Sequence, residues 1–251
     1  MKLNRLKQEW KREENYVFKG WDFSHLNGRW ETESLPWDYT SIVKEYVKPF
    51  YTILDMGTGG GEFLLSLQHP YHLTYATEGY LPNFELCKNT LEPLGISVEY
   101  VAADNVLNFD RNTFDIVLNR HEDFDVKEVN RVLKSGGYFI TQQVGGENGN
   151  DLSRKLLDDF QPLFPKHRIN IYLEQLVNLG YEVLIADEIF PKMKFFDVGA
   201  LVYYAKIIEW EFPKFDVERC FDHLVNCQKE LESKGFISGT EHRFIIVCKK
   251  P

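Results

Sequence analysis

The feature that most constrains the fold of this 251-residue chain is the alternation of short apolar segments with helix-like segments. Five segments rich in β-branched or aromatic residues have the length of strands, and helix-like stretches separate them. The strand-like segments are 51–56, 73–78, 98–103, 114–119 and 137–144, and the helix-like ones are 61–68, 81–92, 125–134, 151–160 and 169–179. Strands joined by helices predict right-handed crossovers, and therefore a doubly wound, Rossmann-like α/β fold with a mostly parallel sheet and helices on both faces.

The remainder of the chain predicts additions to this core. Segments 179–190 and 241–250 have the pattern of two further strands, and a helix is expected over 217–234. We expect a single domain over 1–251, with an N-terminal helical cover at 1–50, a core at 51–190, a C-terminal cap insertion at 191–240 and a last strand at 241–251. The cover and the cap are inferred from aromatic-rich stretches at 20–39 and 194–215, because insertions over the ends of strands commonly build substrate pockets.

Composition limits the classes of protein to consider. The 29 lysines and arginines against 38 aspartates and glutamates give a net charge of −9, which disfavours general binding to a phosphate backbone. No apolar run has the length of a membrane span, and the first 15 residues lack the apolar core of a signal peptide. The four dispersed cysteines form no CxxC pair and are expected to be reduced. These observations predict a cytoplasmic protein that does not associate with membranes.

The sequence "ILDMGTGGGEFLL" at 53–65 places four glycines between two apolar runs, as in a loop between a strand and a helix. A phosphate-binding P-loop requires Gly-Lys-Ser/Thr, but Glu62 follows the last glycine here. The dinucleotide fingerprint GxGxxG begins at Gly57 and Gly59, yet has Glu62 in place of the third glycine. Because an acid at a helix N-terminus repels phosphate, the loop favours a ligand without phosphate.

Residues Asp55 to Gly61 resemble the DxGxGxG loop after the first strand of class I S-adenosylmethionine-dependent methyltransferases, and the resemblance extends over roughly residues 35 to 190. It implies that S-adenosylmethionine is the cofactor, that Glu78 accepts hydrogen bonds from the ribose hydroxyls, and that Asp104 accepts one from the adenine amino group. It also implies that the backbone of the glycine loop approaches the methionine part. The full set of expected cofactor-binding residues is Asp55, Gly57, Thr58, Gly59, Gly61, Glu78, Gly79, Asp104, Asn105 and Asn119.

The acceptor side of the site is expected at the end of the fourth strand, in "LNRHEDFD". His121 is a candidate general base because imidazole titrates near neutral pH, although a purely structural histidine is an equal alternative. The candidate substrate contacts are Arg120, Glu122, Tyr203 and Trp210. The Asn/Asp-Pro-Pro-Tyr/Phe and Pro-Cys signatures of nucleobase methylation are absent from the sequence. No metal site is expected.

The sequence thus predicts a methyltransferase that acts on a small molecule, because an aromatic-lined pocket suits one and the net charge discourages RNA. Two alternatives stay open. One is methylation of ribosomal or transfer RNA, which requires basic residues grouped around the cleft. The other is a protein that binds S-adenosylmethionine without catalysis. Neither the acceptor atom nor the oligomeric state follows from the sequence.

Overall fold

The computed structural model describes residues 2–18, 23–101 and 106–251, and the chain divides into two compact units. Unit 1 consists of Met1–Leu35, Gly145–His167 and Ile189–Arg243, and unit 2 consists of Pro36–Val144, Arg168–Glu188 and Phe244–Pro251. The chain therefore passes between the units five times. These divisions differ from the expected segments, most clearly at 151–160, which we had placed in the core and which belongs to unit 1.

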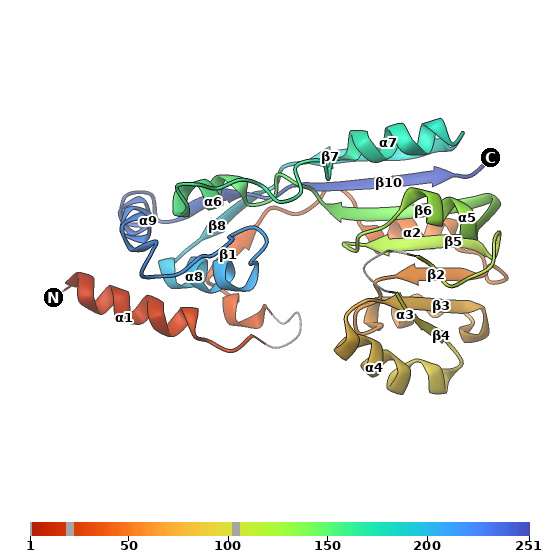
Figure 1. Cartoon of the computed structure of the whole chain (residues 1–251), viewed down its shortest axis with the longest axis horizontal. Helices are drawn as coiled ribbons and strands as arrows, with labels where there is room; N and C mark the ends of the chain where they lie inside the picture. The colour runs from red at the N-terminus through yellow and green to blue at the C-terminus, as the bar shows by residue number, and fades with distance from the viewer. Residues whose placement is uncertain (1, 19–22, 102–105) are drawn as a thin grey trace. The chain divides into compact units, whose positions relative to one another are not determined.

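Unit 2 contains a seven-stranded sheet with the order β4-β3-β2-β5-β6-β10-β7 (Figure 1). Strand β2 pairs in parallel with β3 and with β5, β3 pairs in parallel with β4, and β5 pairs in parallel with β6. The strands are β2 (Ile53–Met56), β3 (Thr74–Glu78), β4 (Ser97–Tyr100), β5 (Phe114–Arg120), β6 (Leu133–Val144), β7 (Glu182–Ile189) and β10 (Arg243–Lys249). This sheet confirms the predicted mostly parallel α/β fold. We call the side at which β2, β3, β5 and β6 end the carboxyl edge.

Strand β10 is antiparallel to its neighbour β6. Gly136, near the start of β6, donates a backbone hydrogen bond to Lys250, which in turn donates to Gly137. Lys250 directly follows the end of β10, so the end of β10 lies beside the start of β6. The residues that begin β10 therefore lie at the carboxyl edge.

Helices cover both faces of this sheet, as the alternation of side chains along the strands requires. In β10, Phe244 and Ile246 join the apolar cluster that includes residues of α5 and α7. Ile245 and Val247, which point the opposite way, join the cluster that includes Tyr39 and Val43 of α2. The helices are α2 (Tyr39–Tyr46), α3 (Glu62–Ser66), α4 (Leu81–Thr90), α5 (Val126–Val132) and α7 (Ile169–Asn178), with short 3-10 turns at Tyr71–Leu73 and Glu92–Leu94. Helix α2 lies within 1–50, the segment in which a helical cover is expected.

Most boundaries in unit 2 differ from the expected ones by a few residues. The largest difference concerns β6, which begins at Leu133, although the sequence predicted a helix to residue 134 and a strand from 137. Leu133 is fully buried and already pairs with Phe114 of β5. This pairing ends α5 at Val132, before Gly136 and Gly137.

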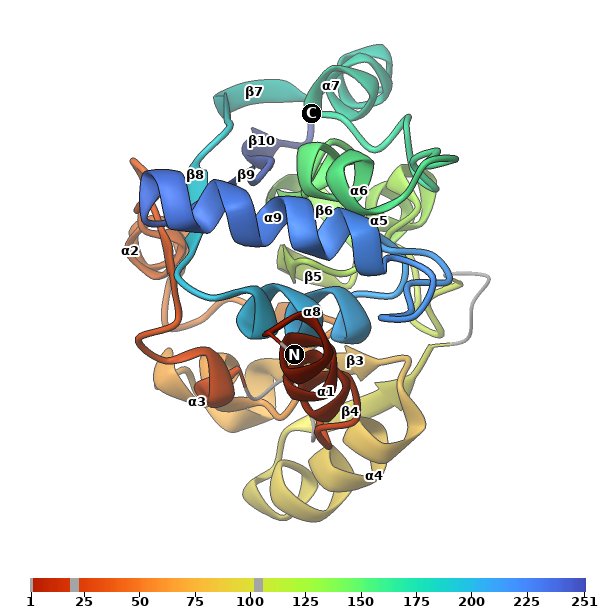
Figure 2. The same cartoon turned by 90° about the vertical axis from the view of Figure 1, so that its left-hand side faces the viewer.

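Unit 1 contains a three-stranded antiparallel sheet, β1-β8-β9, which the sequence did not predict. Its strands are β1 (Trp30–Thr32), β8 (Lys192–Phe195) and β9 (Ile237–Thr240), and its helices are α1 (Lys2–Glu14), α6 (Asn150–Leu156), α8 (Val198–Ile207) and α9 (Phe221–Lys234), with a 3-10 turn at Ser24–Leu26. Helix α1 packs beside α8 (Figure 2). Val198 to Ala205 of α8 are all buried, so α8 is the central helix of this unit.

Unit 1 also buries a polar cluster around Glu211. The side-chain amide of Asn148 donates to Glu211 Oε1 at 2.7 Å, and the hydroxyl of Ser153 donates to the Glu211 carbonyl at 2.8 Å. Among the described residues Glu211 Oε2 has no hydrogen-bond partner, and it lies against the α-carbon of Gly149. Burial raises the pKa of Glu211 to about 7.

Three further observations concern the whole described chain. All four cysteines are buried and none forms a disulfide, as expected. No helix among the described residues is both long and apolar enough to span a membrane. Within the same residues, no cluster of three or more histidine, cysteine, aspartate or glutamate side chains is arranged to hold a metal ion.

Replacing Glu211 with glutamine should stabilise the protein at pH 8 and change its stability little at pH 5. The folded-state pKa of Glu211 lies above the ordinary value of 4.5, so the folded protein binds the proton more tightly than the unfolded chain. The free energy of unfolding therefore falls as the pH rises from about 4.5 to about 7, by up to about 3 kcal/mol for this group.

Thermal unfolding of wild type and Glu211→Gln at both pH values measures this difference. The matched control is Glu209→Gln, since the Glu209 side chain is 74% exposed and should not alter the pH dependence. Equal midpoints for wild type and Glu211→Gln at pH 8 would contradict the expectation.

Candidate active site

The glycine loop joins β2 to α3 at the carboxyl edge. Gly57, Gly59 and Gly61 adopt positive φ angles of 67°, 64° and 85°, which other residues rarely tolerate. The backbone amide of Thr58 donates to the carbonyl of Thr77 in β3 at 3.0 Å and thereby ties the loop to the neighbouring strand. Among the described residues, no atom lies within 4 Å of the position that a Cβ on Gly59 would take. The backbone at Gly59 is therefore open to the close approach of a ligand.

Glu78, the last residue of β3, holds this loop. Its side chain is only 5% exposed, its Oε2 accepts from the amide of Gly59 at 2.7 Å, and its Oε1 accepts from the amide of Tyr80 at 2.8 Å. Each oxygen retains a lone pair for a ligand hydroxyl. Next to it, a Cβ on Gly79 would lie 3.1 Å from the carbonyl of Val101, so the chain is closely packed here. Glu78 thus has a structural role in the loop that the sequence did not predict.

Asp55 lies buried in β2 directly before the loop, with 3% of its surface exposed. Burial raises the pKa of its carboxyl group to about 7, while the charge of Arg120 acts in the opposite direction. The Arg120 guanidinium lies 4.7 Å from the centre of the Phe63 ring. Through its effect on Asp55, Arg120 supplies positive charge close to the start of the glycine loop.

Asn119, near the end of β5, is completely buried. Its Oδ1 accepts from the Thr141 hydroxyl at 3.2 Å and from the amide of Gln143, whereas its Nδ2 has no partner among the described residues. A buried donor without an acceptor costs free energy, which a polar ligand atom would recover.

The sequence analysis did not predict several residues that support this site. The Gln143 amide also donates to the carbonyl of Glu122 at 3.1 Å, and Gln142 contacts His121. Tyr39 is buried, and its hydroxyl donates to the Asn119 carbonyl at 3.2 Å. The signal for the glutamines was the "TQQV" that ends a buried strand, the same pattern that identified Asn119.

His121 and Glu122 follow β5 directly. His121 is exposed and has a φ of 66°, and its Nε2 lies 3.0 Å from the Gln142 side-chain nitrogen. The Glu122 side chain packs against Gly57, because a Cβ on Gly57 would lie 2.5 Å from Glu122 Cβ and 2.8 Å from its Oε2. Burial, together with the smaller effects of the charges of Glu78 and Asp123, raises the pKa of Glu122 to about 7.

Four expected residues have not yet been described. Asp104 and Asn105 lie outside the described residues. Tyr203 and Trp210 belong to unit 1, where Tyr203 is 2% exposed in the core, with its ring centre 4.6 Å from that of His25. Trp210, by contrast, is 41% exposed.

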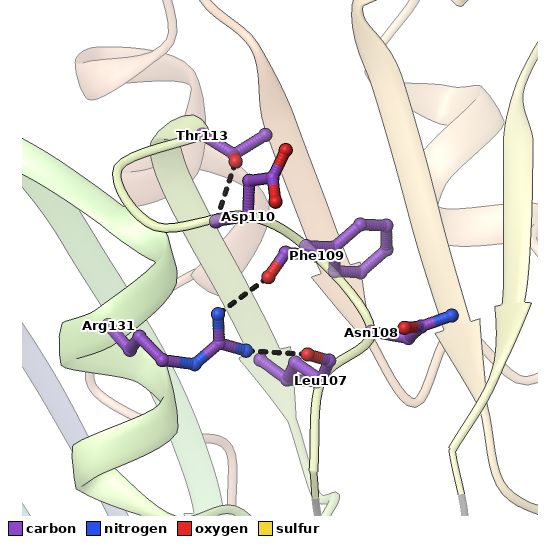
Figure 3. Close-up of a pocket in the computed structure, with 6 residues that line it drawn as sticks. All are labelled: Leu107, Asn108, Phe109, Asp110, Thr113 and Arg131. Carbon is purple, nitrogen blue, oxygen red and sulfur yellow. Dashed lines mark hydrogen bonds between the residues drawn. The ribbon is translucent and has the colours of Figure 1, made fainter.

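A separate pocket lies along the segment that leads into β5 (Figure 3). Arg131 of α5 donates to the carbonyls of Leu107 and Phe109 at 2.5 and 2.6 Å, and Thr113 donates to the Asp110 carbonyl at 2.7 Å. Thr113 directly precedes the amino end of β5, so this part of the pocket lies away from the carboxyl edge. The Arg131 contacts stabilise the segment, and we assign the pocket no role in the site.

Comparisons with known proteins agree with this geometry. The family model described as a methyltransferase domain matches residues 54–141, which include the glycine loop, Glu78 and Asn119. A comparison with curated proteins found no match. Among solved structures, a candidate methyltransferase from Bacillus halodurans is 17% identical with a TM-score of 0.56, and the match covers 85% of this chain and 99% of that one.

Two more solved structures share the fold. The YcgJ protein of Bacillus subtilis is 16% identical with a TM-score of 0.56, and the match covers 84% of this chain and 97% of that one. A protein of unknown function from Deinococcus radiodurans is 9% identical with a TM-score of 0.58, and the match covers 99% of this chain and 98% of that one.

The family match shows that the chain carries a methyltransferase domain, and the strand order and the loop geometry agree with S-adenosylmethionine as its cofactor. The described residues fit this cofactor. The backbone at Gly59 is open, Asn119 offers a buried donor without a partner, and the nearby carboxylates would repel a phosphate but not a sulfonium.

Replacing Glu78 with alanine should weaken binding of S-adenosylhomocysteine by well over tenfold. The substitution removes hydrogen bonds from the carboxylate to ligand hydroxyls, each worth roughly 1.5 to 3 kcal/mol, and also releases the amide of Gly59. Glu78→Gln keeps one acceptor oxygen and should weaken binding less.

Calorimetric titration of folded variants tests this expectation. The control is Glu45→Gln, which changes an exposed acid of α2, outside the glycine loop, and should leave the affinity within about twofold, or about 0.4 kcal/mol. An equally small effect for Glu78→Ala would remove Glu78 from the cofactor site.

Proposed function

We propose that this methyltransferase modifies a small-molecule acceptor at the carboxyl edge of unit 2. The observation that carries the proposal is the open glycine loop, which lies next to the Glu78 carboxylate and to the buried, unpartnered donor of Asn119. S-adenosylmethionine supplies an electrophilic methyl group on a positively charged sulfur.

The individual residues have distinct proposed roles. Glu78 accepts hydrogen bonds from the ribose hydroxyls with the lone pairs that its backbone contacts leave free. Gly57 and Gly59 admit the methionine part, and Asp55 orients its amino end. We also propose, from the family resemblance alone, that Asp104 accepts a hydrogen bond from the adenine amino group and that Asn105 binds the cofactor. The chain lowers the barrier mainly by positioning the acceptor and by excluding water.

We further propose, from the aromatic content of the sequence alone, that residues 194–215 contribute substrate contacts. Of the two aromatic residues that we had selected, exposed Trp210 is the better candidate for a substrate contact, because Tyr203 is used in the core. The net charge of −9 supports a small acceptor over RNA.

S-adenosylmethionine and S-adenosylhomocysteine should raise the thermal midpoint, whereas NAD should not. A ligand that binds the folded state stabilises it by mass action, and the carboxylates of this site oppose the NAD pyrophosphate. A thermal shift with NAD and none with S-adenosylmethionine would contradict the cofactor assignment.

Trp210→Ala should reduce methyl transfer at least severalfold and leave the affinity for S-adenosylhomocysteine within about twofold, or about 0.4 kcal/mol. The assay uses labelled S-adenosylmethionine with the small-molecule fraction of a cell extract, and a second reaction uses the RNA fraction. Phe50→Ala is the matched control, since Phe50 is 74% exposed and belongs to unit 2. Label in RNA alone would favour the alternative acceptor, and equal rates for Trp210→Ala and wild type would exclude this contact.

A further inference from the structure

Glu122 is held over the first glycine of the loop from two directions. Its side chain packs against the α-carbon of Gly57, with Oε2 2.8 Å from the position of a Cβ there. Its backbone carbonyl accepts a hydrogen bond from the Gln143 amide at 3.1 Å. The carboxylate therefore has a defined place beside the part of the loop at which the methionine moiety is proposed to lie.

The surroundings of Glu122 lack a compensating positive charge. The charged groups that act on it are Glu78 from β3 and Asp123 from its own segment, and both are acids. Among the described residues no cation forms an ion pair with Glu122, and the nearby Arg120 lies over the Phe63 ring. A partly buried carboxylate beside two other carboxylates is costly unless a cation joins them.

We propose that Glu122 selects a protonated amine as the methyl acceptor, binds its ammonium group and removes its proton. The inference rests on the proposed function, because it places the acceptor beside the glycine loop. A pKa near 7 suits the removal of a proton from the ammonium group. At neutral pH part of the Glu122 population is ionised and can accept the proton, and the protonated form is stable enough to hold it.

The proposed step balances as follows. The ammonium transfers one proton to a carboxylate oxygen of Glu122, which leaves a neutral amine. The lone pair of that amine forms the new N–C bond with the methyl group, while the S–C bond breaks and its electron pair stays on sulfur. The product is a methylated ammonium, and Glu122 then releases its proton to solvent.

Calorimetric titration with three ligands tests the position of the carboxylate without any methyl transfer. Sinefungin carries a primary amine at the position of the transferable methyl group, on a carbon that replaces the sulfur, and this amine donates hydrogen bonds. S-adenosylmethionine is cationic at sulfur but has no such donor, and S-adenosylhomocysteine is neutral at sulfur. Glu122→Gln should weaken sinefungin at least tenfold, and the other two ligands less than threefold. The wild-type preference for sinefungin over S-adenosylhomocysteine should decline as the pH falls below about 7, because Glu122 is then protonated, and should be flat in the variant.

Glu45→Gln is the control, because it removes an exposed acid of α2, outside the glycine loop, and should change none of the three affinities. If Glu122→Gln loses affinity for sinefungin and for S-adenosylmethionine equally, the Glu122 carboxylate interacts with the sulfonium, and the proposal is overturned. No loss of affinity for either ligand would also overturn it. Failure of wild type to bind S-adenosylhomocysteine would instead contradict the proposed function itself.

The chemical class of the product gives the second test. Wild-type enzyme and labelled S-adenosylmethionine are incubated with the small-molecule fraction of a cell extract, and the products are separated by cation exchange. Label that is retained as a cation and is stable to alkali supports an amine acceptor. Label that alkali releases as methanol identifies a methyl ester and overturns the proposal.

Discussion

Parallel pairing of β2 with β3 on one side and β5 on the other is the constraint on which the rest of the site depends. It brings the ends of three strands to one edge, so that residues 23 and 64 positions apart in sequence, Asp55 with Glu78 and Asn119, become neighbours. The hydrogen bond from Gly59 to Glu78 and the one from Thr58 to Thr77 then fix the loop to β3. A parallel sheet thus orders an otherwise pliable glycine loop.

The sequence predicted unit 2 well because its elements carry local signals. Buried parallel strands are continuous apolar runs, and each lies between recognisable helices and turns. The sheet of unit 1 has no such signal, since β1, β8 and β9 have three or four residues each and β1 finds its partner more than 150 residues away. Helix α8 is apolar on all sides, and its aromatic residues suggested a pocket although Tyr203 packs in a core.

The site was predictable in its residue types and less so in its contacts. Strand ends indicated Asp55, Glu78 and Asn119, but the partners of a side chain depend on loop conformation. The two amides that bind Glu78 therefore became visible only in the structure. The packing of Glu122 on Gly57 has the same origin, because it requires both loops to be in place.

The position of β10 has a consequence for biosynthesis. This strand lies between β6 and β7, yet it is the last of the three in the sequence. As the chain leaves the ribosome, β6 and β7 are made before the strand that joins them, and β6 meanwhile exposes an unpaired edge. The sheet closes only when β10 is inserted between strands that already exist. We expect the nascent chain to require protection from edge-to-edge association during this interval.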